Sequence, residues 1–402
     1  MATTNSSRAL GIAWGRVVAI AAVQSSLTLM WITYRAYLGD MLGSWGFSET
    51  FTTNLLTFEF VLALFMEPIF GLLSDQQQRT LGGRAPLIVL GVILSSVTFV
   101  ALPIIATLQL SLNLLLPLAA IAWALAMTTF RTPVYVLLLK SAPMSELPLA
   151  ISILTMTGGL MGLISGNIKE IILSWGAMPA FLVGSITLLA ASTFLKFLMP
   201  PLQPPADDQP QKNPALPWDG VIRTALIAIA LAWGTKIFMG NFSDVFAGGI
   251  FGAETNLMPL LNLLLALAAV PIAWLWRQWR DYPLLAIALS GLSIMLIFLL
   301  ASPGLAWLYV LVAILWIFAF ATVRNGTLPY IFMTVPGRWA GFGIGVYFGV
   351  SGLANDLFPR IFASENMAVL QGVIGVCALA IAAGLALMPF LPRSSKDLSN
   401  EV

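Results

Sequence analysis

The sequence predicts an all-α membrane protein whose twelve transmembrane helices form two parallel repeats of six. Three observations indicate this fold class. First, the 402 residues are 59% hydrophobic and only 9% charged, too apolar for a soluble chain of this length. Second, twelve stretches are long and apolar enough to cross a bilayer, and they fall into two sets of six around a proline-rich gap. Third, the two sets share sequence, so one set is a copy of the other.

The twelve spans follow from a window of about 20 mainly apolar residues, the length that crosses the hydrocarbon core. The first set lies at 12–36, 51–72, 86–107, 113–139, 149–172 and 177–199. The second set lies at 220–243, 256–276, 282–301, 304–332, 339–361 and 367–390. The chain therefore divides into an N-terminal bundle (1–199), a linker (200–218), a C-terminal bundle (219–392) and a tail (393–402). The prolines of PPLQPPADDQPQKNPALP predict that the linker is extended.

Charge and composition limit the function. With the N-terminus inside, thirteen Lys and Arg residues fall on the cytoplasmic side and three on the other, so both termini are predicted to be cytoplasmic. The net charge of +2 argues against a nucleic-acid partner. Histidine is absent, so proton chemistry falls to Asp or Glu. We expect no enzyme activity, cofactor or metal, and a monomer in a prokaryotic inner membrane.

The repeat is clearest in the fourth and tenth spans. Residues 123–143 read WALAMTTFRTPVYVLLLKSAP and residues 316–336 read WIFAFATVRNGTLPYIFMTVP. An offset of 193 residues aligns Arg131 with Arg324. A weaker match, with an offset near 203, links residues 48–69 to 253–272.

Two six-helix repeats joined by a linker resemble the major facilitator architecture, in which a solute binds near the bilayer midplane between halves that rock. Gly71, Asp75, Arg79, Gly83 and Arg84 resemble the signature that this superfamily carries between its second and third helices. The resemblance implies a gating role for Gly71, Asp75, Arg79 and Arg84 in cytoplasmic water. Asp75 is expected to pair with a basic residue or a helix N-terminus of the other half.

The stretch EPIFGLLSDQQQRTLGGRAPLI, residues 67–88, further resembles the glycoside–pentoside–hexuronide and sucrose/proton symporters. This resemblance implies proton-coupled import of a sugar or glycoside. Two other functions remain open on the same fold. One is a polyspecific exporter of apolar compounds, and the other is a pigment-delivery or light-harvesting assembly factor.

Charged residues inside the spans are candidates for the site, because charge in the membrane is usually functional. Arg131 lies twelve residues before Pro143, and Arg324 lies twelve before Pro336, which places both roughly 18 Å deep. The two arginines would flank the central cavity and bind substrate hydroxyls or carboxylates, or hold a proton-carrying acid. An ion pair that each half needs to fold is the alternative.

Glu67 lies eight residues before Asp75, roughly 12 Å inside the membrane. Its counterpart in the second repeat is Val270, so the acid is present in one half only. By resemblance, the acid before this proline is where melibiose-type symporters bind their cation. We predict that Glu67 couples transport to a proton; the alternative is a structural partner for Arg131. Glu59, two turns away on the same side of the helix, could extend the proton path or simply lie near the outer water.

Other side chains are weaker substrate-binding candidates. Lys236 and Asp244 lie eight residues apart on the seventh span, where an ion pair between helices is the alternative. Trp123 and Tyr34 could stack on a sugar ring, although Trp and Tyr also gather at membrane interfaces. The expected partners are therefore a small-molecule substrate, a proton and the lipid bilayer.

Overall fold

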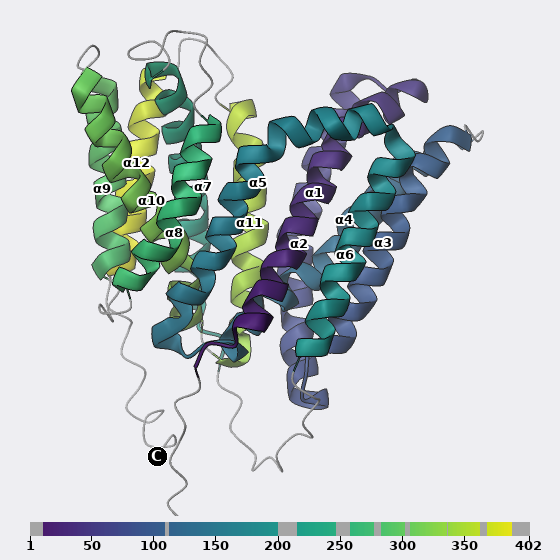
Figure 1. Cartoon of the computed structure of the whole chain (residues 1–402), viewed down its shortest axis with the longest axis horizontal. Helices are drawn as coiled ribbons and strands as arrows, with labels where there is room; N and C mark the ends of the chain where they lie inside the picture. Colours follow the sequence, from purple (N-terminus) through teal and green to yellow (C-terminus); the bar gives the residue numbers. More distant parts are fainter. Residues whose placement is uncertain are drawn as a thin grey trace, which may run out of the picture.

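The computed structural model describes residues 11–108, 112–199, 215–246, 258–276, 283–301, 306–335, 337–361 and 368–387. Within these residues the regular structure is helical, with helices α1 to α12 in chain order (Figure 1). The first six are α1 (Trp14–Ser44), α2 (Glu49–Leu81), α3 (Ala85–Leu108), α4 (Leu115–Val136), α5 (Leu147–Trp175) and α6 (Ala177–Leu198). The second six are α7 (Trp218–Phe246), α8 (Met258–Trp276), α9 (Pro283–Ala301), α10 (Ala306–Thr334), α11 (Ala340–Ile361) and α12 (Ala368–Leu387). This confirms the predicted fold class.

Most helices begin and end within a few residues of the predicted spans, but α1 ends eight residues later than predicted and α2 nine residues later. Helix α2 begins after Ser48, whose hydroxyl accepts a hydrogen bond of 3.1 Å from the backbone N–H of Phe51. It continues about two and a half turns beyond the predicted end and stops at Gly82, whose φ of 74° favours glycine. The hydropathy window missed these turns because they are polar and extend beyond the apolar segment.

The two sets of six form two bundles that meet along a pair of helix contacts. Figure 1 shows α3, α4 and α6 at one side, α9, α10 and α12 at the other, and α5 and α11 where the bundles meet. Helix α2 packs on α11, and α5 packs on α8. Smaller contacts join α10 to α5 and α11 to α4.

Each bundle has a hydrophobic core organised around a repeated tryptophan. Trp123 of α4 and Trp316 of α10, which the repeat aligns, are the two largest fully buried side chains, with exposures of 0% and 1%. Trp123 lies in the core of the first bundle and Trp316 in that of the second. The shared core position supports a common origin for the two halves.

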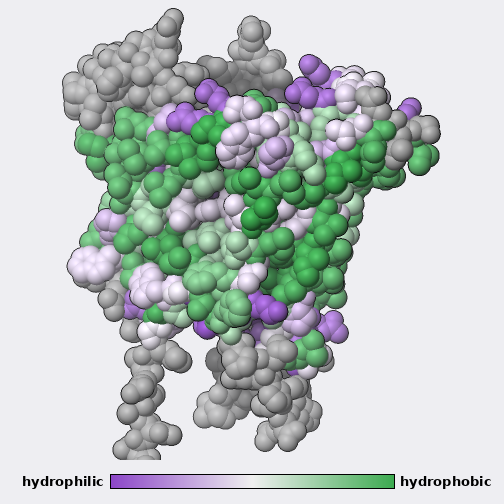
Figure 2. Space-filling model, turned by 45° about the vertical axis from the view of Figure 1, so that its right-hand side comes forward, coloured by the Kyte–Doolittle hydropathy of each residue, from purple (hydrophilic) through white to green (hydrophobic). Residues whose placement is uncertain are grey.

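The outer surface is apolar, as expected for a protein in a bilayer. Figure 2 shows hydrophobic side chains over the middle of the face in view and hydrophilic ones toward its two ends. In the described part of the chain, seven helices are long and apolar enough to cross a membrane: α1 to α7, some in part. Shorter apolar stretches lie at 259–275, 285–297 and 372–387. The chain is an integral membrane protein. The predicted linker, apart from residues 215–218, and the predicted tail lie outside the described residues.

Candidate functional site: a cavity between the two bundles

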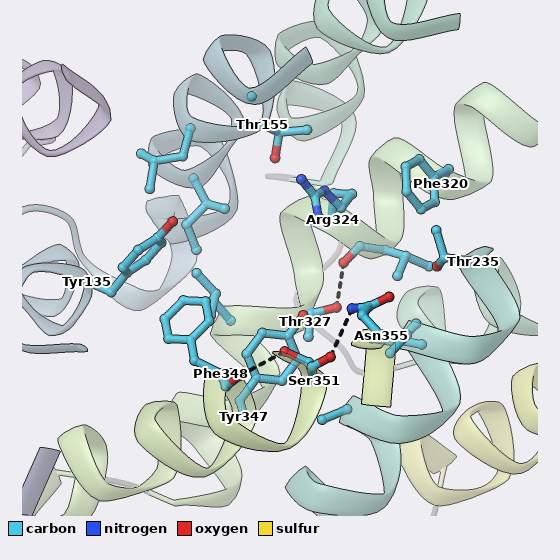
Figure 3. A pocket seen from close by; sticks show the side chains of 18 of the residues that line it. Tyr135, Thr155, Thr235, Phe320, Arg324, Thr327, Tyr347, Phe348, Ser351 and Asn355 are labelled. Carbon is cyan, nitrogen blue, oxygen red and sulfur yellow. Dashed lines mark hydrogen bonds between the residues drawn. The ribbon is translucent and has the colours of Figure 1, made fainter. Parts of the chain in front are cut away.

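A cavity of about 360 Å³ lies between the bundles. Helices α1, α4 and α5 line it from the first bundle, and α7, α10 and α11 line it from the second. Figure 3 shows hydroxyl, amide and aromatic side chains around this space. The polar residues that line it are Gln24, Tyr135, Thr155, Thr235, Arg324, Thr327, Tyr347, Ser351 and Asn355.

Arg324 is the charged residue of this lining. Its side chain extends from α10 toward Thr155 of the other bundle (Figure 3), and a Cβ added to Gly158 of α5 would lie 3.8 Å from its Nη2. The residue is exposed, and its guanidinium lies 5.9 Å from the ring of Phe320, one turn earlier on α10. Arg324 thus lies at the cavity, and its binding of substrate stays a prediction.

Arg131, which occupies the position of Arg324 in the first repeat, forms an ion pair with Glu67. Its Nη2 lies 2.6 Å from Glu67 Oε1, and the hydroxyl of Thr132 donates a hydrogen bond to the other carboxylate oxygen. Glu67 is 0% exposed. The guanidinium of Arg131 also lies 5.1 Å from the ring of Phe348, a residue of the cavity wall. The ion pair is therefore separated from the cavity by the side chain of Phe348. This position is compatible with Glu67 as the proton-coupling group and with Glu67 as a structural partner for Arg131.

Glu59 lies apart from the cavity lining. It is 3% exposed, and the hydroxyl of Tyr34 donates a hydrogen bond to its Oε1. Its Oε2 is buried without a hydrogen-bond partner among the described residues. The structure thus brings Glu59 to Tyr34 and not to Glu67.

Tyr34 and Trp123 do not line the described cavity, in contrast to their predicted role in stacking on the solute. Both are 0% exposed, and their ring centroids lie 4.4 Å apart. Trp123 also packs on Phe99 at 5.1 Å. The correction has a simple reason: their faces of α1 and α4 point into the first bundle, where large aromatic rings fill the core.

Lys236 lies beside the cavity without lining it. Its Nζ donates a hydrogen bond of 2.8 Å to the backbone oxygen of Asn355, a lining residue. The side chain of Asp244 lies outside the described residues, so the predicted pairing of the two remains a prediction.

The uncharged polar lining was missed from the sequence. Thr327 of α10 and Ser351 and Asn355 of α11 are uncharged polar residues within mainly apolar spans. The spacing of Ser351 and Asn355 by four places them on one helix face. A search for polar residues that share a face within a span could have found them.

At one end of the bundles, α2 and α11 are joined through Asp75. Its two carboxylate oxygens accept hydrogen bonds of 3.0 Å each from the backbone N–H groups of Gly341 and Phe342, in the first turn of α11. Arg84 Nη2 lies 2.5 Å from the same carboxylate, and Arg84 Nε donates to Ser74 at 2.9 Å. Asp75 therefore binds the helix N-terminus of the other half that the sequence led us to expect. We call this the Asp75 end.

One expectation for this end needs correction. Asp75 and Arg84 were expected in water, but they are 2% and 6% exposed. They tolerate burial because each is paired with the other and because the first N–H groups of a helix lack partners within it. Arg79 stays on its own helix, donating to the backbone oxygen of Asp75 at 3.3 Å. Gly71 faces Gly341 so closely that a Cβ on Gly71 would overlap the Gly341 carbonyl.

A second contact joins α2 and α11 at their opposite ends. The hydroxyl of Thr57 donates a hydrogen bond of 2.6 Å to Asp356 Oδ2. Arg360 pairs with Asp356 at 3.5 Å and donates to the backbone oxygen of Thr53 at 2.6 Å. We call this the Asp356 end.

The comparison with known families identifies the architecture. The family model of the Major Facilitator Superfamily matches residues 18–359 of this chain. The chain belongs to this superfamily. It is therefore a transporter by family, and not an enzyme. No curated protein matches the chain in sequence.

Solved structures of three transporters share the fold at low sequence identity. The human organic anion transporter MFSD10 (TETRAN) matches with a TM-score of 0.63 and 14% identity, covering 94% of this chain and 98% of its own. A bacterial homologue of the iron transporter ferroportin, in the outward-facing state with soaked iron, matches with a TM-score of 0.67 and 12% identity. The match covers 94% of this chain and 99% of the homologue. The proton:xylose symporter XylE matches with a TM-score of 0.64 and 14% identity, and the match covers 92% of this chain and 94% of XylE. At these identities the likeness shows the fold alone.

Proposed function

We propose that this transporter carries a small hydroxylated solute of the sugar or glycoside class by proton-coupled alternating access. It would act in a prokaryotic inner membrane with the Asp75 end in the cytoplasm. The observation that carries the proposal is the cavity between the bundles, with the buried pair of Glu67 and Arg131 one side chain behind its wall. Hydroxyl and amide groups in the lining suit a solute rich in hydroxyls. The resemblance of residues 67–88 to sugar symporters, and the shared fold with XylE, are consistent with it.

Coupling follows from the position of Glu67. As a carboxylate it holds Arg131 at 2.6 Å. When Glu67 takes up a proton its charge is lost, and the guanidinium, which already lies against Phe348, becomes available to the cavity. Proton binding and solute binding would thus favour one another, which is the linkage that symport requires.

Alternating access requires contacts that open in turn. The hydrogen bonds of Asp75 to α11 would close the cytoplasmic end, and those of Asp356 to α2 would close the other. A state open to one side retains one of these contacts and breaks the other.

The test is uptake of labelled sugars and glycosides into proteoliposomes, with and without an imposed pH gradient. We expect uptake to require the inward proton gradient. Glu67→Gln keeps the shape of the side chain but cannot release a proton, so it should abolish accumulation while retaining exchange of solute across the membrane. Accumulation by this variant would assign Glu67 a structural role only.

The same assay separates the other functions. Efflux of apolar compounds without sugar uptake would favour the exporter. Absence of all transport, with pigment bound to the purified protein, would favour the assembly factor.

A further inference from the structure

The two repeats treat their matching arginines differently. Arg131 of α4 pairs with Glu67 of α2 at 2.6 Å. Arg324 of α10 forms no ion pair with any carboxylate in the described part of the chain. In the second repeat, the residue that corresponds to Glu67 is Val270 of α8. The second half therefore keeps the cation and lacks the acid.

The surrounding geometry of the two halves is nevertheless alike. The residue after each arginine donates a hydrogen bond across to the partner helix at the level of the proline. Thr132 donates to Glu67 on α2. Asn325 donates at 2.8 Å to the backbone oxygen of Ala269 on α8, the residue before Val270. Since α10 meets α8 as α4 meets α2, the missing acid is a difference in charge and not in architecture.

The unneutralised arginine faces the cavity. Arg324 is exposed and points toward Thr155 of the other bundle (Figure 3), whereas the side chain of Arg131 is 20% exposed. A guanidinium stays charged at any physiological pH and offers a planar fork of donors that matches a carboxylate. In a site enclosed by protein, such a charge attracts an anion more strongly than it would in water.

We propose that Arg324 binds a carboxylate of the solute, so that the substrate is a small hydroxylated organic anion. The solute then supplies the acid that the second half lacks, and the threonine, serine and asparagine side chains of the lining bind its hydroxyl groups. This inference rests on the proposed function, because it takes the cavity to be the solute site.

Matched probes test the inference. The full chain is purified in detergent, and binding is measured by its thermal stabilisation with D-glucuronate against D-glucose, and with D-xylonate against D-xylose. We expect the two acids to bind and their neutral partners to bind at least tenfold more weakly. Arg324→Gln should weaken binding of the acids roughly 10- to 100-fold, the usual range for a hydrogen bond to a charged group. Arg324→Lys, which keeps the charge but loses the fork, should fall between. Lys196→Gln removes an exposed charge at the end of α6 and should change nothing.

A second variant keeps Arg324 in place. Val270→Glu restores the missing acid, which should pair with Arg324 and exclude an external carboxylate. Binding of the acids should then fall as in Arg324→Gln, even if Arg324→Gln itself fails to fold.

The outcomes separate this inference from the proposed function. Neutral sugars that bind as well as their acids, or acids that bind equally to Arg324→Gln and to Val270→Glu, would overturn the role of Arg324 and leave sugar transport standing. If no probe, neutral or anionic, binds or is taken up into proteoliposomes, both are rejected.

Discussion

Glu67 and Arg131 are two opposite charges between neighbouring helices, the first fully buried and the second partly buried, and each depends on the other. Truncating one partner of such a pair leaves the other charge uncompensated, which typically costs about 3–5 kcal/mol. Arg131→Gln should therefore lower the thermal unfolding temperature of the purified protein strongly. Glu67→Gln alone should do so less, because the side chain of Arg131 is 20% exposed and its guanidinium can turn toward the cavity, whereas Glu67 is 0% exposed.

The double variant Glu67→Gln with Arg131→Gln is the control for this prediction. Two neutral amides in place of the pair should recover much of the stability that Arg131→Gln loses. If the double variant is as unstable as Arg131→Gln, the arginine stabilises the bundle through packing, for example against Phe348, and not through Glu67.

At the residue scale, the sequence predicted that Glu67 and Arg131 could meet, but it predicted few of the other contacts. Counting along the helices placed Glu67 and Arg131 inside the membrane, and the structure pairs them. The same counting could not show that Asp75 is buried, because its cover comes from α11, more than 260 residues later. It also could not tell that Trp123 faces the core of its bundle, since cavity-facing and core-facing sides of a span are similarly apolar.

At the scale of elements, the contact between α2 and α11 should control which end of the cavity opens. Asp75→Asn removes the ion pair with Arg84 and leaves a side chain that can accept at only one oxygen, so it cannot hold both N–H groups of α11. A loss of about 1.5–3 kcal/mol would change a balanced equilibrium by at least tenfold. We expect the population to shift toward states open at the Asp75 end.

Cysteine labelling measures this shift. The single native cysteine, Cys377, is exposed and must first be replaced. A cysteine at Thr155 in the cavity should then react faster with a reagent applied from the Asp75 end and more slowly from the Asp356 end. Asp356→Asn, which weakens the contact with Thr57, is the matched variant at the other end and should shift labelling the opposite way. Equal labelling in both variants would remove this helix pair from the gate.

The bounds of the helices were largely predictable, since apolar length is a local property of the chain. The interface between them was not. Gly71 and Gly341 lie so close that a Cβ on either would overlap the backbone of the other, but a glycine in an apolar span does not reveal which helix it faces. The repeat identifies matching positions within each half and leaves the contacts between halves undetermined.

At the scale of the whole molecule, the two halves share a fold but not a charge pattern. This difference determines how much net charge crosses the membrane with each solute molecule. With Glu67 ionised, its pair with Arg131 is neutral, and Arg324 leaves one positive charge in the cavity. A proton on Glu67 adds one positive charge, and a bound monoanion removes one. The loaded and empty forms of the protein then carry the same net charge at the midplane.

Symport of one proton with one monoanion should therefore be electroneutral. A neutral sugar carried with one proton would instead move one charge, and a potential of 100 mV acts on one charge with about 2.3 kcal/mol, roughly a 50-fold change in accumulation. Proteoliposomes with a fixed pH gradient, and a potassium diffusion potential set by valinomycin, distinguish the two. We expect accumulation of D-glucuronate to be the same at zero and at 100 mV of inside-negative potential, because proton and anion cross together. Accumulation that rises with the potential would mean that an uncompensated proton crosses with the solute, and that Arg324 is not matched by an anion during transport.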